Sequence, residues 1–229
     1  MQIISNNTGI PPSSLPIYEN LFGFIECSLP DFTPLSKTNK GKQVDEEDDI
    51  TEDLVSFFED KIETLNLDEN KTFKFTNQSK QGRNKTDIGV RLGRKYLASN
   101  RPLCCWIEAK RLPTPDSGRT RDEREYVFVD KTKNKFKGNG GIQRFKEGKH
   151  ASTLPFSIMI GYIQSDDASY WIEQINGWII NLVNELPAFW NTNDCLREQI
   201  SDKCNRYVSL HERENNLGKI EIHHFWINV

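Results

Sequence analysis

The chain has 229 residues, with 30 Lys and Arg against 33 Asp and Glu, and a formal net charge of −3. This length suits one sizeable domain with appendages, and the longest apolar runs are far too short to cross a bilayer. Its five cysteines, which include no CxxC pair, indicate reduced thiols and no disulfide framework. Because no signal peptide is visible, we expect a cytoplasmic protein that does not engage a membrane.

Positive charge is concentrated in the middle of the chain. The segment from Lys71 to Lys149 has 21 basic and 8 acidic residues, a balance of +13, while the remainder has 9 basic and 25 acidic residues, a balance of −16. A basic segment inside an acidic protein favours a surface that binds a polyanion. The alternative is that these charges are neighbours in sequence without sharing one surface.

The first part of the chain is expected to lie outside the main domain. Residues 1–46 are assigned to an N-terminal arm and acidic linker, and residues 47–229 to a single domain. The segment Met1–Pro34, rich in Pro, Ser and Asn, favours an extended arm or a small edge element. Ser36–Asp49 has almost no apolar residues, which is typical of a linker.

Apolar periodicity predicts the elements that follow. A helix is predicted from the shared spacing of Ile50, Leu54, Phe57, Phe58, Ile62 and Leu65. Strands are predicted at Phe73–Thr76, Asp87–Leu92, Leu103–Lys110, Phe156–Ile163, Tyr207–His211 and Lys219–Ile227. Further helices are predicted from near Gly141 towards Ala151, through Trp171–Leu182, and over Leu196–Tyr207, while Pro113–Gly141 is expected to be a long loop with some hairpin in it. This order predicts a mixed α/β (α+β) domain.

Three charged residues in this pattern have the spacing of a catalytic site. Glu108 and Lys110 are two apart on a predicted strand and share a face, and Asp87 precedes the neighbouring strand, 21 positions upstream of Glu108. Facing carboxylates need a cation between them to stay ionised, and oxygen ligands suit Mg²⁺ or Mn²⁺. A nearby lysine suits phosphodiester hydrolysis. The alternative is an ordinary solvated strand face.

These motifs resemble those of the PD-(D/E)xK nucleases, the restriction-endonuclease-like group, over roughly Glu47–Ile163. Thr86-Asp87-Ile88 is similar to the first strand motif, with Thr in place of Pro, and Glu108-Ala109-Lys110 to the second. The resemblance implies a restriction-endonuclease-like core, in which a central mixed sheet is flanked by helices. It also implies the family order of an N-terminal core helix, often with an acidic residue, then the two motif strands, then a helix.

The resemblance also implies roles for individual residues. Glu47, Asp87, Glu108 and the backbone carbonyl of Ala109 would hold one or two Mg²⁺ or Mn²⁺ ions, and Lys110 would activate water or stabilise charge. Glu47 is in helical phase with the apolar face of its helix and so can point inward, although five consecutive acids at 45–49 also suit a solvated helix cap.

The segment Gly140-Gly141-Ile142-Gln143-Arg144-Phe145 resembles the helix that follows the second motif in the family. Gln143 is therefore expected to join the catalytic set, and Arg144, Lys146 and Lys149 to contact nucleic acid. The paired glycines would let a phosphate approach the backbone N–H groups at the helix start, or they are ordinary loop glycines.

Together these features predict a Mg²⁺-dependent nuclease that hydrolyses DNA, and family analogy suggests an effector of prokaryotic defence against phage or other foreign DNA. The expected partners are DNA and a regulatory or helicase/ATPase protein, with self-association left open. The alternatives are an RNA-cleaving nuclease, or a catalytically silent subunit that binds nucleic acid or docks in a larger complex. The histidines His211, His223 and His224 do not have zinc-site spacing and are expected to be structural.

Overall fold

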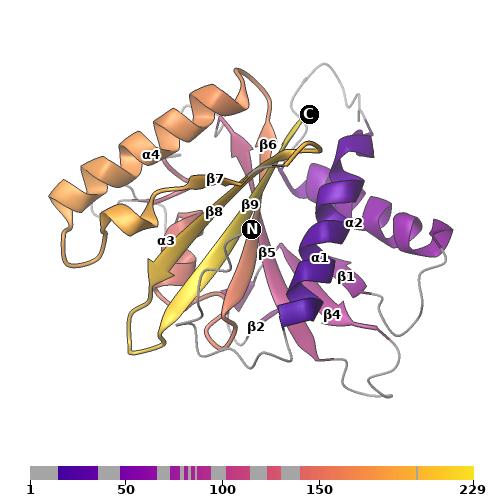
Figure 1. The fold of residues 1–229 in the computed structure, drawn as a ribbon, viewed down its shortest axis with the longest axis horizontal. Coiled ribbons are helices and arrows are strands. Elements are labelled where there is room, and N and C mark those ends of the chain that lie inside the picture. The colour runs from indigo at the N-terminus through magenta and orange to yellow at the C-terminus, as the bar shows by residue number, and fades with distance from the viewer. Residues whose placement is uncertain are drawn as a thin grey trace.

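The computed structural model describes residues 15–35, 47–65, 73–77, 80–81, 84–85, 87–93, 102–113, 123–129, 140–199 and 201–229. They form a mixed seven-stranded sheet with helices on both faces (Figure 1), which confirms the expected mixed α+β class. The elements are α1 Leu15–Ser28, η2 Leu29–Asp31, α2 Glu47–Thr64, β1 Phe73–Asn77, β2 Lys80–Gln81, β3 Asn84–Lys85, β4 Ile88–Leu92, β5 Leu103–Leu112, α3 Gly141–Lys146, β6 Phe156–Ile163, α4 Ala168–Glu185, η3 Thr192–Asp194, β7 Arg197–Gln199, β8 Asn205–Glu212 and β9 Lys219–Asn228.

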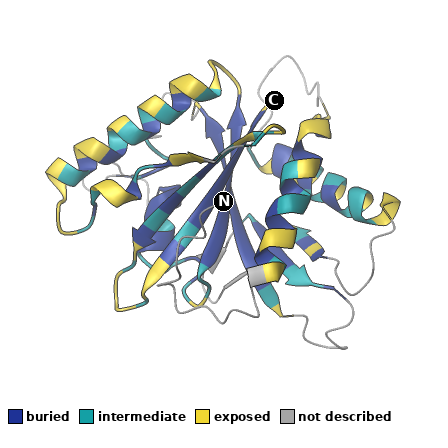
Figure 2. Ribbon diagram, in the orientation of Figure 1, coloured by how far each residue is buried: buried dark blue, intermediate teal, exposed yellow. Residues whose placement is uncertain are grey.

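The sheet has a parallel centre between two antiparallel flanks. Its strand order is β1-β4-β5-β6-β9-β8-β7, and β5, β6 and β9 run parallel to one another. The outer pairs are antiparallel, and β2 pairs with β3 in a separate ladder. Strands covered on both faces favour continuous apolar runs; accordingly, β6 is buried along its whole length (Figure 2).

Two hydrophobic cores lie on opposite faces of this sheet. Side chains of β5 enter one core or the other. Cys105, Ile107 and Ala109 belong to the core with α1 and α2, and Trp106 and Leu112 belong to the core with α3 and α4. The period-two alternation of a strand produces this division. Polar residues of β5 that follow the same alternation therefore lie at the margin of a packed core, where their geometry is constrained.

Helix α4 has a single apolar stripe, as its periodicity predicts. Asp167 begins the helix by accepting a hydrogen bond from the Tyr170 N–H at 2.8 Å, an N-cap interaction. Its buried residues follow the i, i+4, i+8, i+11 spacing: Trp171, Ile175, Ile179 and Leu182.

The prediction of an extended N-terminal arm is wrong for Leu15–Ser28, which forms α1 and packs into the core. Four of its side chains are buried: Tyr18, Leu21, Phe22 and Ile25. Their spacing of three, four and seven is a helical stripe, so the sequence did hold the signal. Most of the expected linker, residues 36–46, lies outside the described residues.

A helix over Leu196–Tyr207 is also a wrong prediction, since the short edge strand β7 and the start of β8 occupy this segment. Leu196, Ile200, Cys204 and Tyr207 do have helical spacing, but antiparallel pairing with β8 determines the conformation of Arg197–Gln199. Tertiary pairing outweighs weak local preference in such short segments.

Helix α3 ends at Lys146, earlier than expected. Gly148 follows with φ of +67°, the left-handed conformation that commonly ends a helix. A Cβ at this position would lie 2.3 Å from Leu217 Cδ1, which the leucine side chain can relieve by moving, so the backbone angle is what favours glycine here. Inside the expected loop Pro113–Gly141, between its described ends, the structure describes residues 123–129, whose Tyr126 and Val127 are buried.

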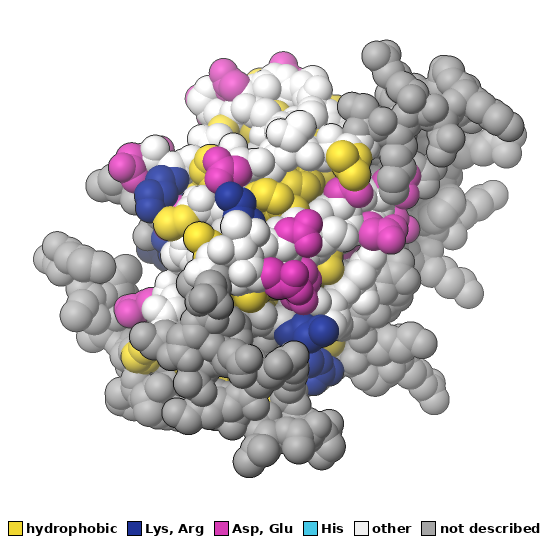
Figure 3. Space-filling model, turned by 90° about the vertical axis from the view of Figure 1, so that its right-hand side faces the viewer, with side chains coloured by type: hydrophobic (Ala, Val, Ile, Leu, Met, Phe, Trp, Pro, Cys, Tyr) yellow, Lys and Arg dark blue, Asp and Glu magenta, His cyan; other side chains and the backbone are white. Residues whose placement is uncertain are grey.

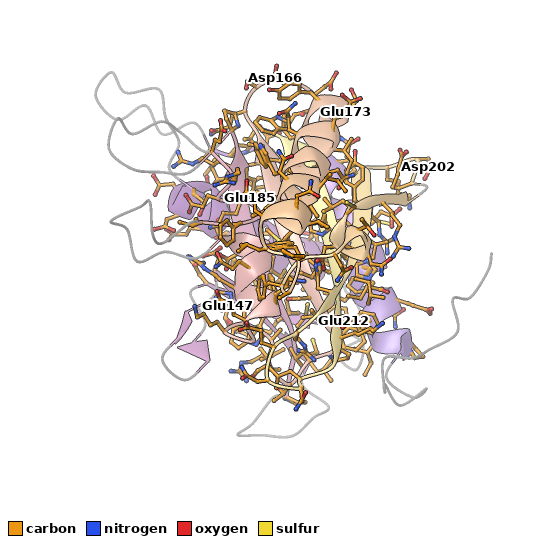
Figure 4. The ribbon with its side chains drawn as sticks, turned by 90° about the vertical axis from the view of Figure 1, so that its left-hand side faces the viewer. Glu147, Asp166, Glu173, Glu185, Asp202 and Glu212 are labelled. Atoms are coloured by element: carbon orange, nitrogen blue, oxygen red, sulfur yellow. The ribbon has the colours of Figure 1, made fainter. Side chains whose placement is uncertain are left out.

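Acidic side chains gather on the outer side of α4. Figure 4 shows Asp166, Glu173 and Glu185 on this side, and α4 itself contains no Lys or Arg. On the α1 and α2 side, Figure 3 shows acidic side chains across the middle of the visible surface, beside hydrophobic atoms and smaller groups of basic ones. The α4 side would therefore repel a polyanion.

Within the described part of the chain, no helix is both long enough and apolar enough to span a membrane.

Candidate active site

The candidate site lies where β5 continues past the end of β4. Pairing between these strands ends at Ile88 and Ile107. Residues of β5 beyond this point that face away from β6 therefore present backbone groups to an open edge. Two carboxylates occupy this edge: Asp87 Oδ2 accepts from the Ala109 N–H at 2.8 Å, and Glu47 Oε2 accepts from the Arg111 N–H at 3.2 Å.

Lys110 lies at the centre of this group. Its Nζ is 2.7 Å from Glu47 Oε1 and 3.4 Å from Glu108 Oε1, and its side chain is only 4% exposed. Burial by itself would lower the pKa of Lys110, but Glu47, Glu108 and Asp87 outweigh it and raise that pKa above its ordinary value. Lys110 therefore keeps its charge at neutral pH.

Glu108 is fully buried and surrounded by cationic groups. Arg144 forms an ion pair with Oε1, and His150 Nδ1 lies 3.3 Å from Oε2. Burial would raise the pKa of Glu108, but Lys110, His150 and Arg144 together lower it to about 2. Glu108 is thus a permanent anion whose position is fixed from three sides.

Asp87 has the opposite balance. Burial, with the charge of Glu108 in addition, raises the pKa of Asp87 to about 7, although Lys110 and the Ala109 N–H act in the other direction. The Asp87 carboxylate is therefore the under-compensated charge of the group. A further cation beside it would restore its ordinary acidity.

Glu47 reaches the site because it is the first residue of α2. Thr51, one turn on, is buried; its Oγ1 donates to the Glu47 carbonyl at 2.7 Å and lies 3.1 Å from the Tyr162 hydroxyl on β6. This contact turns the first turn of α2 so that Glu47 points inward, as its helical phase predicts. The structure therefore brings Glu47, Asp87, Glu108 and Lys110 together.

Gln143 is placed differently from its expected catalytic position. Its Oε1 accepts from the N–H groups of Gly140 and Val129, and its Nε2 donates to Glu147 at 2.8 Å. The side chain is 5% exposed and holds the start of α3 to the preceding segment. In this conformation the amide oxygen is occupied by two backbone N–H groups, and one of the two Nε2 hydrogens is directed at Glu147.

The glycine pair before α3 has a packing role, not the phosphate-binding role considered above. The N–H groups of Gly141, Ile142 and Gln143 donate to carbonyls of the segment 125–127, so they are not available to a phosphate. A Cβ on Gly140 would lie 2.3 Å from the Phe128 backbone nitrogen, and one on Gly141 would lie 2.8 Å from the Tyr126 carbonyl. Only glycine permits this approach.

The three basic residues expected to contact nucleic acid have different positions. Arg144 binds Glu108 but keeps 24% of its side chain exposed, and Lys149 is 38% exposed beside Glu147. Lys146 is 1% exposed, with its Nζ 2.8 Å from both oxygens of the buried Asp194. Arg144 and Lys149 can meet solvent next to the site, whereas Lys146 is part of the core. Residues 131–139 of the expected basic stretch lie outside the described residues.

Lys146 is one end of a buried chain of hydrogen bonds. From Asp194 the chain runs to His211 (2.7 Å), Ser209 (2.6 Å), His224 (2.7 Å), Tyr126 (2.9 Å) and Trp226 (2.9 Å). His223, on the other face of β9, stacks on Phe22 with ring centroids 3.7 Å apart. All three C-terminal histidines therefore have protein partners inside the fold.

The carboxylates are directed at the chain's own cations. Among the described residues, no three His, Cys, Asp or Glu side chains stand in an arrangement that would hold a metal ion as they are placed. Two observations nevertheless fit a divalent cation: the raised pKa of Asp87, and Glu108 Oε2, which is buried without a hydrogen-bond partner in the described part of the chain. The Ala109 carbonyl lies on the same side of β5 as its N–H, and hence on the Asp87 side.

The sequence motifs identified the residues on β5 and α2, but they missed His150. It is the first histidine of the chain, directly after the basic segment Lys71–Lys149, and it follows the segment Gly140–Phe145 that resembles the family helix. Its distance in sequence from the other three histidines was the available signal for a separate role. In comparisons with known proteins, no family model, curated protein or solved structure matches this chain.

Proposed function

We propose that the chain is a divalent-metal-dependent nuclease with a restriction-endonuclease-like core, acting on DNA phosphodiester bonds. One observation carries the proposal: three carboxylates, from Glu47, Asp87 and Glu108, surround the buried ammonium of Lys110 at the open edge of β5. Burying charged groups costs free energy. A strand end with only a structural role therefore has no need of three carboxylates around a buried ammonium. The order α2, β4, β5, α3 also supports the proposal, since it is the order of the family motifs.

In this proposal Asp87, Glu108 and the Ala109 carbonyl would hold Mg²⁺ or Mn²⁺, with Glu47 next to them. The ion would supply a Lewis acid and a more acidic bound water. Lys110 remains charged between Glu47 and Glu108 and would stabilise the negative charge that develops on phosphoryl oxygens. Arg144 neutralises Glu108 on one side, which leaves the carboxylate's other oxygen for a further cation.

Nucleic acid would approach from the side of α3 and the carboxyl end of β5. Arg144 and Lys149 are the partly exposed cations there, whereas the outer side of α4 is acidic (Figure 4). Phosphate contacts of this kind give sequence-independent, salt-dependent affinity. We propose that binding is mainly electrostatic, and that a regulatory or helicase/ATPase partner presents the substrate in a defence role.

The test is cleavage of supercoiled plasmid, linear duplex, single-stranded DNA and RNA, each with Mg²⁺, Mn²⁺ or EDTA. Glu108→Gln should abolish cutting, while the matched control Glu173→Gln, on the exposed side of α4, should cut like the parent. Thermal melting checks that each variant is folded. Cutting that survives EDTA, or that persists in Glu108→Gln, would refute the proposal, and preferential cleavage of RNA would change the substrate.

A second candidate is a catalytically silent module that binds nucleic acid. The observation in its favour is that Glu47 and Glu108 already have cationic partners in Lys110 and Arg144. Such a module would bind DNA equally well with and without divalent ions and would cut none of the substrates. A nuclease should instead bind a divalent ion at the site itself, as titration calorimetry can measure.

A further inference from the structure

Two buried polar atoms face each other beside the candidate site at ion-pair distance, and among the described residues neither makes a well-aligned hydrogen bond to any group. Glu108 Oε2 and His150 Nδ1 are 3.3 Å apart, and their side chains are 0% and 3% exposed. The other oxygen of Glu108 is engaged by Arg144 and Lys110. Polar atoms removed from water without partners are unfavourable, so a species shared between them would stabilise this arrangement.

The position of His150 is fixed by the turn that follows α3. Gly148 and Ala151 both have left-handed backbone angles, with φ of +67° and +53°. The His150 N–H donates to the Arg144 carbonyl at 3.3 Å, so the chain folds back beneath the helix that positions Arg144. The imidazole packs edge-on against Phe145, with ring centroids 5.7 Å apart. The ring is therefore held in place before any ligand binds.

We propose that His150 is a metal ligand, and that a first-row divalent transition-metal ion, with Mn²⁺ as the first choice, binds between its Nδ1 and Glu108 Oε2. This inference rests on the proposed function and adds a nitrogen ligand to its metal centre. Adjacent ligands of an octahedral ion with bonds of about 2.1 Å are about 3 Å apart. The observed separation of 3.3 Å is near this edge, so little movement is needed.

A nitrogen ligand changes which ion the site prefers. Mg²⁺ favours oxygen ligands and releases its water reluctantly, whereas imidazole suits first-row transition metals, and Mn²⁺ accepts carboxylate oxygen as well. A site built from carboxylates alone would treat Mg²⁺ and Mn²⁺ more evenly. Glu108 with His150 should therefore bind Mn²⁺ more tightly than Mg²⁺.

The experiment is pulsed electron paramagnetic resonance on the full chain loaded with Mn²⁺, which detects nitrogen-14 nuclei bonded to the ion, together with calorimetric titration of Mn²⁺ and Mg²⁺. The parent should show imidazole nitrogen coupling and bind Mn²⁺ at least about tenfold more tightly than Mg²⁺. In His150→Gln the coupling should vanish, and Mn²⁺ affinity should fall about tenfold or more, by analogy with the 10–100-fold effects of perturbing metal-site shells. Mg²⁺ affinity should change little.

The matched control is His223→Gln, a buried histidine on the α1 face, which should keep both the coupling and the affinity. Mn²⁺ that binds without nitrogen coupling, or that does not bind, overturns the inference, and so does coupling that persists in a folded His150→Gln variant. The parent spectrum decides the question even if that variant does not fold. Nitrogen coupling in a chain that cuts no nucleic acid supports this inference and refutes the proposed nuclease. Cleavage by a chain whose bound Mn²⁺ shows no nitrogen coupling supports the nuclease and refutes this inference.

Discussion

Replacing Lys146 by Met tests two assignments of this residue. The sequence predicts that Lys146 contacts nucleic acid, whereas the structure places it in the buried core. In the fold, Lys146 Nζ is 2.8 Å from both oxygens of Asp194, and the two side chains are 1% and 0% exposed. The same ammonium lies 5.2 Å and 5.0 Å from the ring centroids of Phe189 and Trp190. Removing one partner of a buried ion pair costs about 3–5 kcal/mol, because the other charge stays buried.

The lower end of that range applies here, since Asp194 keeps hydrogen bonds from His211 at 2.7 Å and from the Asn191 N–H at 2.9 Å. Met also refills most of the apolar volume. We therefore expect Lys146→Met to lose about 3 kcal/mol of unfolding free energy, or about 6–12 °C in Tm for a chain of this size. Urea unfolding and thermal melting would measure this loss.

Lys149→Met is the matched control, because Lys149 is 38% exposed and surface substitutions usually change stability by less than about 0.5 kcal/mol. DNA affinity gives the complementary measurement. Lys146→Met should leave it unchanged in the folded protein, and Lys149→Met should weaken it. A Lys146→Met variant that is as stable as the parent but binds DNA poorly would refute the structural reasoning and restore Lys146 as a phosphate contact.

Three further predictions concern charge at the site and in the core. Lys110→Met should reduce cleavage by about 10²–10³-fold and should also destabilise the fold, because Lys110 is buried between two carboxylates; Lys219→Met, at an exposed ion pair, is its control, and parent-like cleavage would contradict the assignment. Asp87→Asn should stabilise the fold at pH 8 by up to about 4 kcal/mol, because the pKa of Asp87 is about 7 in the folded chain against an ordinary value of 3.8, and folding therefore penalises the ionised form. The gain in unfolding free energy should disappear as pH falls to about 4. A gain that does not depend on pH would contradict this cause. His211 and His224 have folded pKa values lowered by burial, so their contribution is complete above about pH 6.5 and is lost below it. Chemical unfolding should show stability falling below about pH 6.5, by up to about 1.4 kcal/mol per pH unit for His224, whose pKa is lowered further than that of His211. Asp87 has the opposite pH dependence and should offset this loss in the parent but not in Asp87→Asn, so a flat profile in Asp87→Asn would show that the histidines are not buried neutral.

The periodic segments of the fold could be predicted from the sequence, because their partners select for apolar spacing. Strand β6 matches its predicted bounds, and the alternation of Leu103–Lys110 predicted β5 to within two residues of its end. Helix α1 was missed because its Pro- and Asn-rich surroundings suggested a loop, although Tyr18 and Leu21 begin a helical stripe. The edge strand β7 had no local signal, since its pairing with β8 is a long-range property.

For the site, spacing along strands predicted which side chains come together but not what each of them contacts. The two-residue period places Glu108 and Lys110 on one face, and helical phase turns Glu47 inward. Partner choice depends on contacts between distant segments. Gln143 accepts hydrogen bonds from the Gly140 and Val129 backbone, and these contacts could not be predicted without knowing where residues 123–129 pass.

The buried chain from Trp226 to Asp194 has only one consistent arrangement of protons. The indole of Trp226 can only donate and the ionised Asp194 can only accept, and burial lowers the pKa of both histidines, which keeps their rings neutral at neutral pH. With neutral rings, every group between the two ends accepts from the Trp226 side and donates towards Asp194. This fixes the two histidines as opposite tautomers: His224 carries its proton on Nε2, and His211 carries its proton on Nδ1. Nitrogen-15 NMR should find these two tautomers at neutral pH. The hydrogen-bond dipoles of this buried chain would then all point the same way, from Trp226 towards Asp194 in η3.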